Sequence, residues 1–137
     1  MEYHTVYLGL GSNVGDRRAT LSRAVQMIDK LVGAVVRRSA FYETEPWGFD
    51  SSHAFVNAAV CCRTALTPRG VLLETQAIER ALGRTHKSEG GHYADRTVDI
   101  DILLYDDISV DEPDLKIPHP LMRQRDFVMV PLGEIMG

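Results

Sequence analysis

Hydrophobic residues recur along this chain at two spacings, which separate strand-like stretches from helix-like ones. Alternating or continuously apolar runs, bounded by glycine, proline or polar residues, are typical of strands. They lie over Thr5 to Leu10, Ala34 to Thr44, Ala54 to Thr64 and Arg96 to Tyr105. The pattern therefore predicts four strands distributed along nearly the whole chain.

Two other stretches carry apolar residues at the three- and four-residue spacing of an amphipathic helix. The first follows Asp16, a capping residue, and runs to about Val32. The second begins at Thr67-Pro68 and runs to about Leu82. The resulting order, β-α-β-β-α-β, is the split βαβ arrangement of ferredoxin-like α+β folds. We expect an antiparallel sheet with both helices packed on one face and a ligand site on the other.

Two short segments carry further expectations. Gly9, Gly11 and Gly15 resemble a phosphate-binding loop, but their G-x-G-x-x-x-G spacing matches neither the dinucleotide fingerprint nor a Walker loop. We interpret these glycines as a tight turn from a strand into a helix. The segment from Ile108 to Val110 is expected to pair back on the preceding strand as a short hairpin.

Two carboxylates project together from the last predicted strand. The apolar residues of that strand alternate along one face and comprise Val98, Ile100, Ile102 and Leu104. Asp99 and Asp101 project from the other face, with backbones about 6.6 Å apart. Adjacent like charges disfavour each other, whereas Mg²⁺ is commonly held by one or two carboxylates together with water and phosphate oxygens. The pair indicates a metal site, with two solvated surface acids as the alternative.

Basic and polar side chains flank this acidic pair in the sequence. They comprise Arg84, His86, Lys87, His92 and Arg96 before the strand, and His119, Arg123 and Arg125 after it. Gln76 and Glu79 share one face of the second predicted helix, where an exposed helical surface is the alternative. Cations beside paired carboxylates suit a metal-bound polyphosphate, because both neutralise charge on phosphoryl oxygens. A solvated charge cluster is the competing interpretation.

An aromatic residue and an amide begin the third predicted strand. Phe55 and Asn57 are two positions apart, so they point to the same face. A ring offers a stacking surface, and an amide both donates and accepts hydrogen bonds. This pair fits a flat heterocycle, although a core phenylalanine and a turn asparagine are the commoner arrangement.

Composition and charge limit the kinds of protein that this chain can be. The 137 residues are 45% hydrophobic and 25% charged with a formal net charge of −4, which fits one globular domain over residues 1–137 and speaks against nucleic-acid binding. No run approaches a membrane span, and the N-terminal residues lack a signal-peptide pattern. Adjacent Cys61 and Cys62 are interpreted as reduced packing residues. We expect a cytoplasmic monomer that acts on small molecules, without membrane or nucleic-acid partners.

Several short motifs occur in order along the chain. They are Gly-Ser-Asn at 11–13, Phe-Tyr-x-Thr-x-Pro-x-Gly at 41–48, Phe-Val-Asn at 55–57, Gln-x-x-Glu at 76–79, Gly-Arg at 83–84, Arg-Thr-Val-Asp-Ile-Asp-Ile-Leu-Leu at 96–104 and Pro-His-Pro-x-Met-x-x-Arg-x-Phe at 118–127. From about Val6 to Ile135 the chain resembles the 6-hydroxymethyl-7,8-dihydropterin pyrophosphokinase family. The resemblance implies a ferredoxin-like fold and transfer of pyrophosphate from ATP to the pterin hydroxymethyl group, which yields AMP and the pterin diphosphate used in folate biosynthesis.

Matching positions imply roles for individual residues. Asp99 and Asp101 would bind two Mg²⁺ ions, and Arg84 and Arg96 would assist catalysis. The ATP site would be lined by Gln76, Glu79, Arg84, Arg96, Ile102, His119 and Arg125. The pterin site would comprise Phe55 and Phe127 on either side of the ring, Asn57 at its amide edge, and Thr44, Trp47 and Tyr93.

Two other classes of function stay open from the residues alone. One is a different D-x-D metal-dependent nucleotidyl, phosphoryl or glycosyl transferase, since ferredoxin-like folds and paired acids occur there too. The other is a non-catalytic ferredoxin-like binding module. The aromatic and amide pair disfavours the first class, and the acidic net charge disfavours an RNA-binding module.

Overall fold

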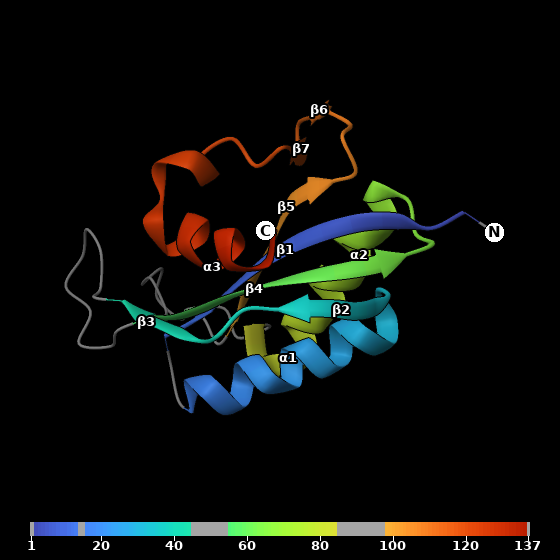
Figure 1. Ribbon diagram of the computed structural model, residues 1–137. Coiled ribbons are helices and arrows are strands. Elements are labelled where there is room, and N and C mark those ends of the chain that lie inside the picture. The colour runs from blue at the N-terminus through green and yellow to red at the C-terminus, as the bar shows by residue number, and fades with distance from the viewer. Residues whose placement is uncertain (1, 14–15, 45–54, 85–97, 137) are drawn as a thin grey trace, which may run out of the picture.

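An antiparallel sheet forms the centre of the computed structural model, which describes residues 2–13, 16–44, 55–84 and 98–136 (Figure 1). Its strands are β1 (His4–Ser12), β2 (Ala34–Arg38), β3 (Tyr42–Thr44), β4 (Phe55–Thr64) and β5 (Asp99–Tyr105). They are ordered β2-β4-β1-β5, and β3 also pairs with β4. All of these pairings are antiparallel. The predicted ferredoxin-like α+β order is confirmed, with β1 and β4 at the centre.

The two predicted helices form with the predicted caps. They are α1 (Arg17–Leu31) and α2 (Pro68–Glu79), and the turn η1 (Arg80–Arg84) continues α2. The Asp16 side chain accepts a hydrogen bond from the Ala19 N–H at 3.2 Å, and the Thr67 hydroxyl accepts one from Gly70 at 3.0 Å. Gly83 in η1 has a φ of 112°, which favours glycine. Within the described residues, no helix is long and apolar enough to span a bilayer.

Helices α1 and α2 cover one face of the sheet, the first face (Figure 1). The cluster between them and the strands includes Val6, Leu8, Leu10, Leu21, Ile28, Val60, Ile78, Ile100 and Ile102. Leu8, Leu21, Ile28 and Ile78 are each 0% exposed. Because aliphatic side chains from three strands and two helices interlock here, this layer supplies most of the apolar burial that stabilises the domain.

The second face is half covered by a helix that was not predicted. This helix is α3 (Asp126–Met136), preceded by the turn η3 (Met122–Gln124). Its Leu132 and Ile135 pack with Ala59, Cys61 and Leu103 of the sheet. Figure 1 shows α3 on the side of the sheet opposite to α1. The expectation that two helices share one face is confirmed, but only one end of the other face is left for a ligand.

The predicted strand from Ala34 to Thr44 is divided in two. Between β2 and β3, the Ser39 N–H donates to the Ala59 carbonyl at 2.9 Å, and the Ser39 hydroxyl accepts from the Ala59 N–H at 2.9 Å. A side chain therefore replaces one ladder bond at this point, and the chain shifts its position along β4.

The expected hairpin between Ile108–Val110 and the preceding strand is wrong. Instead, β6 (Val110–Glu112) pairs with β7 (Leu115–Ile117) in a separate two-stranded sheet. Asp106, at a φ of 49°, turns the chain out of β5: its N–H donates to the Thr5 carbonyl at 2.7 Å, and its carboxylate accepts from the Thr5 N–H at 2.8 Å. This turn ties the end of β5 to β1, so the following residues lead away from the sheet.

A bulge in β5 interrupts the predicted alternation. Tyr7 pairs with Leu104, whereas Leu8 pairs with Ile102, so Leu103 is an additional residue on β5. As a result, Leu103 and Leu104 both pack in the cluster under α3. The prediction that Leu104 shares the face of Ile100 and Ile102 is therefore wrong, because the bulge reverses the alternation after Ile102.

Candidate active site

Two glycines in the central strand let side chains from the neighbouring strands lie over β1. Gly11 is the register partner of Asn57 on one side and Asp99 on the other, and Gly9 is the partner of Asp101. Neighbouring strands are about 4.8 Å apart, so the backbones of Asn57 and Asp99 are about 10 Å apart across Gly11. The interpretation as a turn is wrong for Gly9 and Gly11, because both lie inside β1, and Gly15 lies outside the described residues.

Contacts at Gly11 define the direction of the Asn57 amide. A Cβ atom on Gly11 would lie 3.0 Å from Asn57 Oδ1 and 3.8 Å from Phe55 Cδ1. Both side chains therefore lie over the central strand on the same face, as their period-two spacing predicts. Asn57 is only 4% exposed, so its amide is held in a nearly buried position beside the aromatic ring.

The paired carboxylates lie on the same face, across β1 from the amide. Asp99 is half-buried and Asp101 is exposed. Carboxylate oxygens are ligands that hard divalent cations prefer. The described residues contain no group of three or more potential His, Cys, Asp or Glu ligands. An ion held by Asp99 and Asp101 would thus complete its shell with water or substrate oxygens, which is usual for Mg²⁺.

Glu79 of α2 supports the backbone between the two acids. It is 5% exposed, and its carboxylate accepts a hydrogen bond from the Ile100 N–H at 2.8 Å. The bond reaches the edge of β5 away from β1, which pairs with no other strand among the described residues. An exposed helical surface is thus the wrong interpretation for Glu79, whereas Gln76, three residues earlier, is exposed. Glu79 holds the acidic strand against α2.

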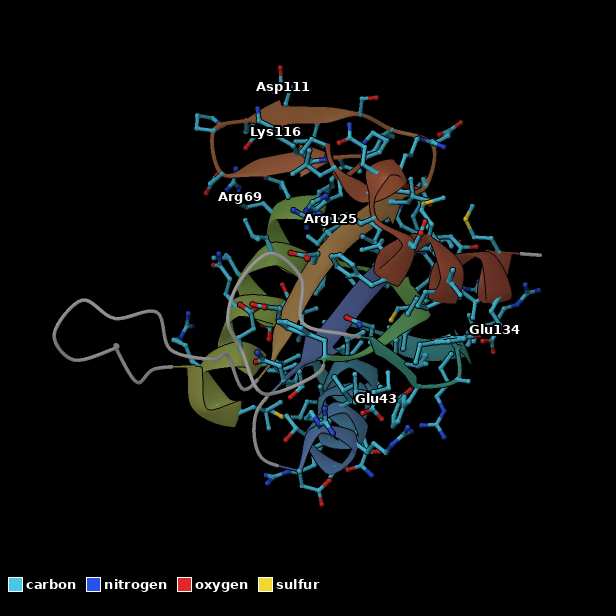
Figure 2. All side chains as sticks on the ribbon, turned by 90° about the vertical axis from the view of Figure 1, so that its left-hand side faces the viewer. Glu43, Arg69, Asp111, Lys116, Arg125 and Glu134 are labelled. Carbon is cyan, nitrogen blue, oxygen red and sulfur yellow. The ribbon has the colours of Figure 1, made fainter. Side chains whose placement is uncertain are left out.

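His119 returns to the acidic strand after the β6–β7 hairpin. Its N–H donates to the Leu103 carbonyl at 3.1 Å, which places it two positions beyond Asp101 on the same edge. The hairpin is fastened to α2 by Arg69, which forms ion pairs with Glu112 and, at 2.7 Å, with Asp114 (Figure 2). The main chain of the predicted site residue His119 is therefore held at the edge of the acidic strand, and its ring accepts a hydrogen bond from the Leu121 N–H at 3.3 Å.

Arg125 and Phe127 lie next to each other at the start of α3. The Arg125 guanidinium carbon is 5.6 Å from the centroid of the Phe127 ring, within cation–π range, and both side chains are half-buried. Figure 2 shows Arg125 where the chain enters this helix. Both residues therefore lie at the start of the helix that packs on the second face. Stacking of one ring between Phe55 and Phe127 stays a prediction.

Ile102 is placed differently from the other predicted nucleotide residues. Its side chain is 6% exposed and packs in the cluster under α1 and α2. Only its main chain can therefore face a ligand on the second face. Trp47, Tyr93 and Arg96 lie outside the described residues, as do the side chains of Thr44 and Arg84.

The two cysteines are packing residues, as expected. Both are free and buried, and they point to opposite faces of β4: Cys62 packs under the two helices and Cys61 under α3. Burial raises the pKa of Cys62 to about 12, so this thiol stays protonated near neutral pH. Burial also raises the pKa of Cys61. Neither group is suited to act as a thiolate nucleophile or metal ligand.

Sequence reasoning missed Gly9 and Gly11 as part of this site. The signal was present, because Leu8 and Leu10 alternate with Tyr7, Gly9 and Gly11 once the first strand is extended to Ser12. Glycine in a strand interior often marks a close approach by another group.

Comparison with known proteins points to one family. The family model described as 7,8-dihydro-6-hydroxymethylpterin-pyrophosphokinase (HPPK) matches residues 7–137. A curated 2-amino-4-hydroxy-6-hydroxymethyldihydropteridine pyrophosphokinase from Porphyromonas gingivalis is 56% identical over 131 residues, which is 95% of this chain and 89% of that protein. One with the same name from Aquifex aeolicus is 40% identical over 96% of this chain and 79% of its own length.

Larger proteins contain a similar region. The mitochondrial folate synthesis bifunctional protein of Pisum sativum is 36% identical over 96% of this chain, which spans 25% of that protein. A crystal structure of HPPK-DHPS in complex with substrates has a TM-score of 0.77 and 15% identity, covering 98% of this chain and 40% of that one. The crystal structure of wild-type HPPK-DHPS of Plasmodium falciparum has a TM-score of 0.74 and 15% identity, and the match covers 94% of this chain and 40% of that one. These structures support the fold.

Proposed function

This chain belongs to the HPPK family, and from that membership we propose that the second face of its sheet transfers pyrophosphate from ATP to 6-hydroxymethyl-7,8-dihydropterin. The products are AMP and the pterin diphosphate used in folate biosynthesis. The proposal treats residues 1–137 as one pyrophosphokinase domain. Its partners are these small molecules, and we propose that the protein acts as a cytoplasmic monomer.

The observation that carries the proposal is the line of Asn57, Gly11 and Asp99 across three adjacent strands. An amide that both donates and accepts hydrogen bonds stands on one side, and a carboxylate stands on the other. The distance of about 10 Å between their backbones suits a heterocycle whose amide edge pairs with Asn57 while its hydroxymethyl group lies toward the acids. Phe55 provides a ring beside Asn57, and we propose Phe127 as the second stacking surface.

The donor set of the acidic strand fits magnesium. Asp99 and Asp101 are oxygen ligands on one face, and we propose that they hold two Mg²⁺ ions together with phosphate oxygens. When bound, the ions supply charge neutralisation and polarisation at the phosphate oxygens. Glu79 contributes indirectly, because its bond to the Ile100 N–H holds the backbone between the two ligands.

The triphosphate is proposed to lie along the edge of β5. We propose that His119 and Arg125 approach it from the segment after the hairpin, and Gln76 from the exposed side of α2. Ile102 would contribute its main chain. We propose that Arg84 and Arg96 bind the phosphates as well, and that Thr44, Trp47 and Tyr93 complete the pterin site. The basic side chains offset the charge that develops as AMP leaves.

The reaction is a displacement at phosphorus. The pterin hydroxymethyl oxygen forms a bond to the β-phosphorus, the bond from that phosphorus to the α,β-bridging oxygen breaks, and the hydroxyl proton passes to solvent. The leaving group is AMP, and the β- and γ-phosphates move together to the pterin. Positioning and charge neutralisation account for most of the catalysis of such transfers.

Incubating the purified chain with Mg²⁺, ATP and 6-hydroxymethyl-7,8-dihydropterin tests this function. We expect AMP and the pterin diphosphate in equal amounts by chromatography, and no AMP when the pterin is left out or the metal is chelated. Stoichiometric ADP would instead indicate an ordinary kinase. Binding of Mg²⁺-ATP without turnover would indicate a non-catalytic binding module. Either result would contradict the proposal.

A further inference from the structure

The C-terminal part of α3 is fastened to the chain between β2 and β3 by one carboxylate. Both oxygens of Glu134 accept hydrogen bonds from the Ala40 N–H, at 3.2 and 3.1 Å. The Tyr42 hydroxyl also donates to this carboxylate. Figure 2 shows Glu134 beside the sheet, at the end of the red helix. Hydrogen bonds to a charged acceptor are stronger than neutral ones, so Glu134 is the main polar anchor between α3 and this segment.

Tyr42 is also a neighbour of the proposed pterin ligand Asn57. The two are register partners in the antiparallel pairing of β3 with β4. Directly opposite residues point to the same face with Cβ atoms about 4.5–5.5 Å apart. Asn57 therefore has Gly11 on one side and Tyr42 on the other, and Tyr42 bounds the amide on the side away from the acids.

Helix α3 connects this anchor to the second aromatic residue of the site. Phe127 and Glu134 are seven residues apart, which is two helical turns, so they project from the same side of α3. At 1.5 Å per residue they are about 10.5 Å apart along the axis. Arg37 provides a second attachment, since its guanidinium donates to the Ile135 carbonyl at 3.1 Å. A helix held at this end has a defined position at the end that carries Phe127.

We propose that Glu134 and Tyr42 are positioning residues for the pterin, which set the distance between Asn57 on β4 and Phe127 on α3. The inference rests on the proposed function, because it assumes that Asn57 and Phe127 face one pterin. Neither residue needs to touch ATP or the metal. Their loss should therefore weaken the use of the pterin selectively, which distinguishes positioning from general support of the fold.

Steady-state AMP release separates these roles, with pterin and ATP varied independently. For Tyr42→Phe and Glu134→Ala we expect the KM for the pterin to rise about threefold to tenfold, the effect of losing one net hydrogen bond. The KM for ATP and kcat should stay within about twofold. Glu134→Gln keeps an acceptor for Ala40 and Tyr42, so it should recover most of the wild-type KM. The Tyr42→Phe/Glu134→Ala double variant should be no worse than Glu134→Ala alone.

Glu43 offers a matched control on the same strand. Glu43 is the next residue after Tyr42, so its side chain points to the opposite face of β3. It is exposed, and its carboxylate lies 3.7 Å from the guanidinium of Arg17. Glu43→Gln should therefore leave both KM values unchanged. Unchanged pterin KM in Tyr42→Phe and Glu134→Ala would overturn the positioning role, as would an equal rise in both KM values. Failure of the wild-type chain to release AMP would instead overturn the proposed function, so the two failures are distinguishable.

Discussion

The two faces of the sheet use the same strands for different purposes. On the first face, Leu8, Leu10 and Ile100 pack against α1 and α2 along the length of the strands. On the second face, Leu103 and Cys61 pack under α3 at one end, while Asn57 and the acids occupy the other. Neighbouring residues of β5 therefore belong to different layers: Ile100 is in the core, and Asp99 and Asp101 face the site.

This division indicates which substitutions should cost stability and which should cost activity. A residue on the first face contributes chiefly apolar burial, so its loss should unfold the protein without altering the site. A residue at the polar end of the second face contributes little apolar burial, and adjacent like charges there disfavour each other. Loss of a residue that holds α3 on the sheet should affect both stability and activity to an intermediate extent.

The largest effect is expected at the acidic pair. Asp101→Asn keeps the shape of the side chain but removes one of two proposed anionic ligands, so turnover should fall by about 10³-fold or more. The thermal midpoint should stay unchanged or rise, because repulsion between paired carboxylates is relieved. AMP release and thermal denaturation measure the two outcomes. Asp111→Asn is the control, since Asp111 is an exposed acid on β6 that pairs with Lys116. Near-normal turnover in Asp101→Asn would contradict the metal role.

On the first face we expect the opposite result, a loss of stability with unchanged substrate binding. Leu8 is 0% exposed between the sheet and the helices, and Leu8→Ala should lower the free energy of unfolding by about 2–5 kcal/mol. The fraction that remains folded should keep its KM for both substrates. Urea denaturation measures the loss, with Leu73→Ala on the exposed side of α2 as the control. A large change in KM with little loss of stability would remove the distinction between the faces.

Phe127→Ala should affect binding of the pterin while the protein stays folded. Stacking of a base on an aromatic ring is worth about 1–3 kcal/mol, so pterin affinity should fall by about one to two decades. Calorimetric titration of the pterin in the presence of an ATP analogue measures this change. Val130→Ala, at a residue of α3 that is 53% exposed, should bind the pterin normally. Full affinity in Phe127→Ala would exclude the second stacking surface.

A smaller effect is expected from adding one methyl group to the central strand. In Gly11→Ala the new Cβ atom would lie 3.0 Å from Asn57 Oδ1, so the amide must move away from the strand. Loss of one net hydrogen bond to the pterin would raise its KM about threefold to tenfold. Steady-state kinetics with the pterin varied measures the change. A pterin KM equal to wild type would show that the position of Asn57 is not critical.

The smallest effect is expected when a glycine of α3, Gly133, is replaced by alanine. A Cβ atom on Gly133 in α3 would meet no heavy atom within 4 Å, and alanine is the better helix former by about 0.5–1 kcal/mol. Gly133→Ala should therefore raise the free energy of unfolding by about that amount, with unchanged kinetics. Thermal and urea denaturation of Gly133→Ala and Gly11→Ala, measured together, would distinguish a glycine that only weakens its helix from one that leaves room for a neighbouring side chain. Destabilisation of Gly133→Ala would contradict this assignment.

Local patterns in the sequence were sufficient to predict the first face. Asp16 and Thr67 cap the helices that they were expected to cap, and the alternation around Ile100 and Ile102 matches their burial. These features depend on neighbours within a few residues, so the sequence alone can reveal them. The shared face of Phe55 and Asn57 follows from the same period of two.

The second face depends on contacts that are distant in sequence. Helix α3 contains Pro131, Gly133 and several β-branched residues, which are poor helix formers, and packing of Leu132 and Ile135 on the sheet compensates for this low propensity. The bulge at Leu103 has no signature in the apolar run Ile102-Leu103-Leu104. The bond from Glu79 to Ile100 joins residues 21 positions apart. Such features appear only once the elements are packed together.

The hydrogen bonds made along the outer edge of β5 also affect whether this strand can pair with a strand of another molecule. A strand that ends a sheet can pair with a strand of another molecule, and this is a common start of aggregation. Here the Ile100 N–H is occupied by Glu79, and the Leu103 carbonyl by His119. Losing either contact would free an edge group in the strand that carries the acids. By accepting from the Ile100 N–H, Glu79 removes one donor that a strand of another molecule would need in order to pair with β5.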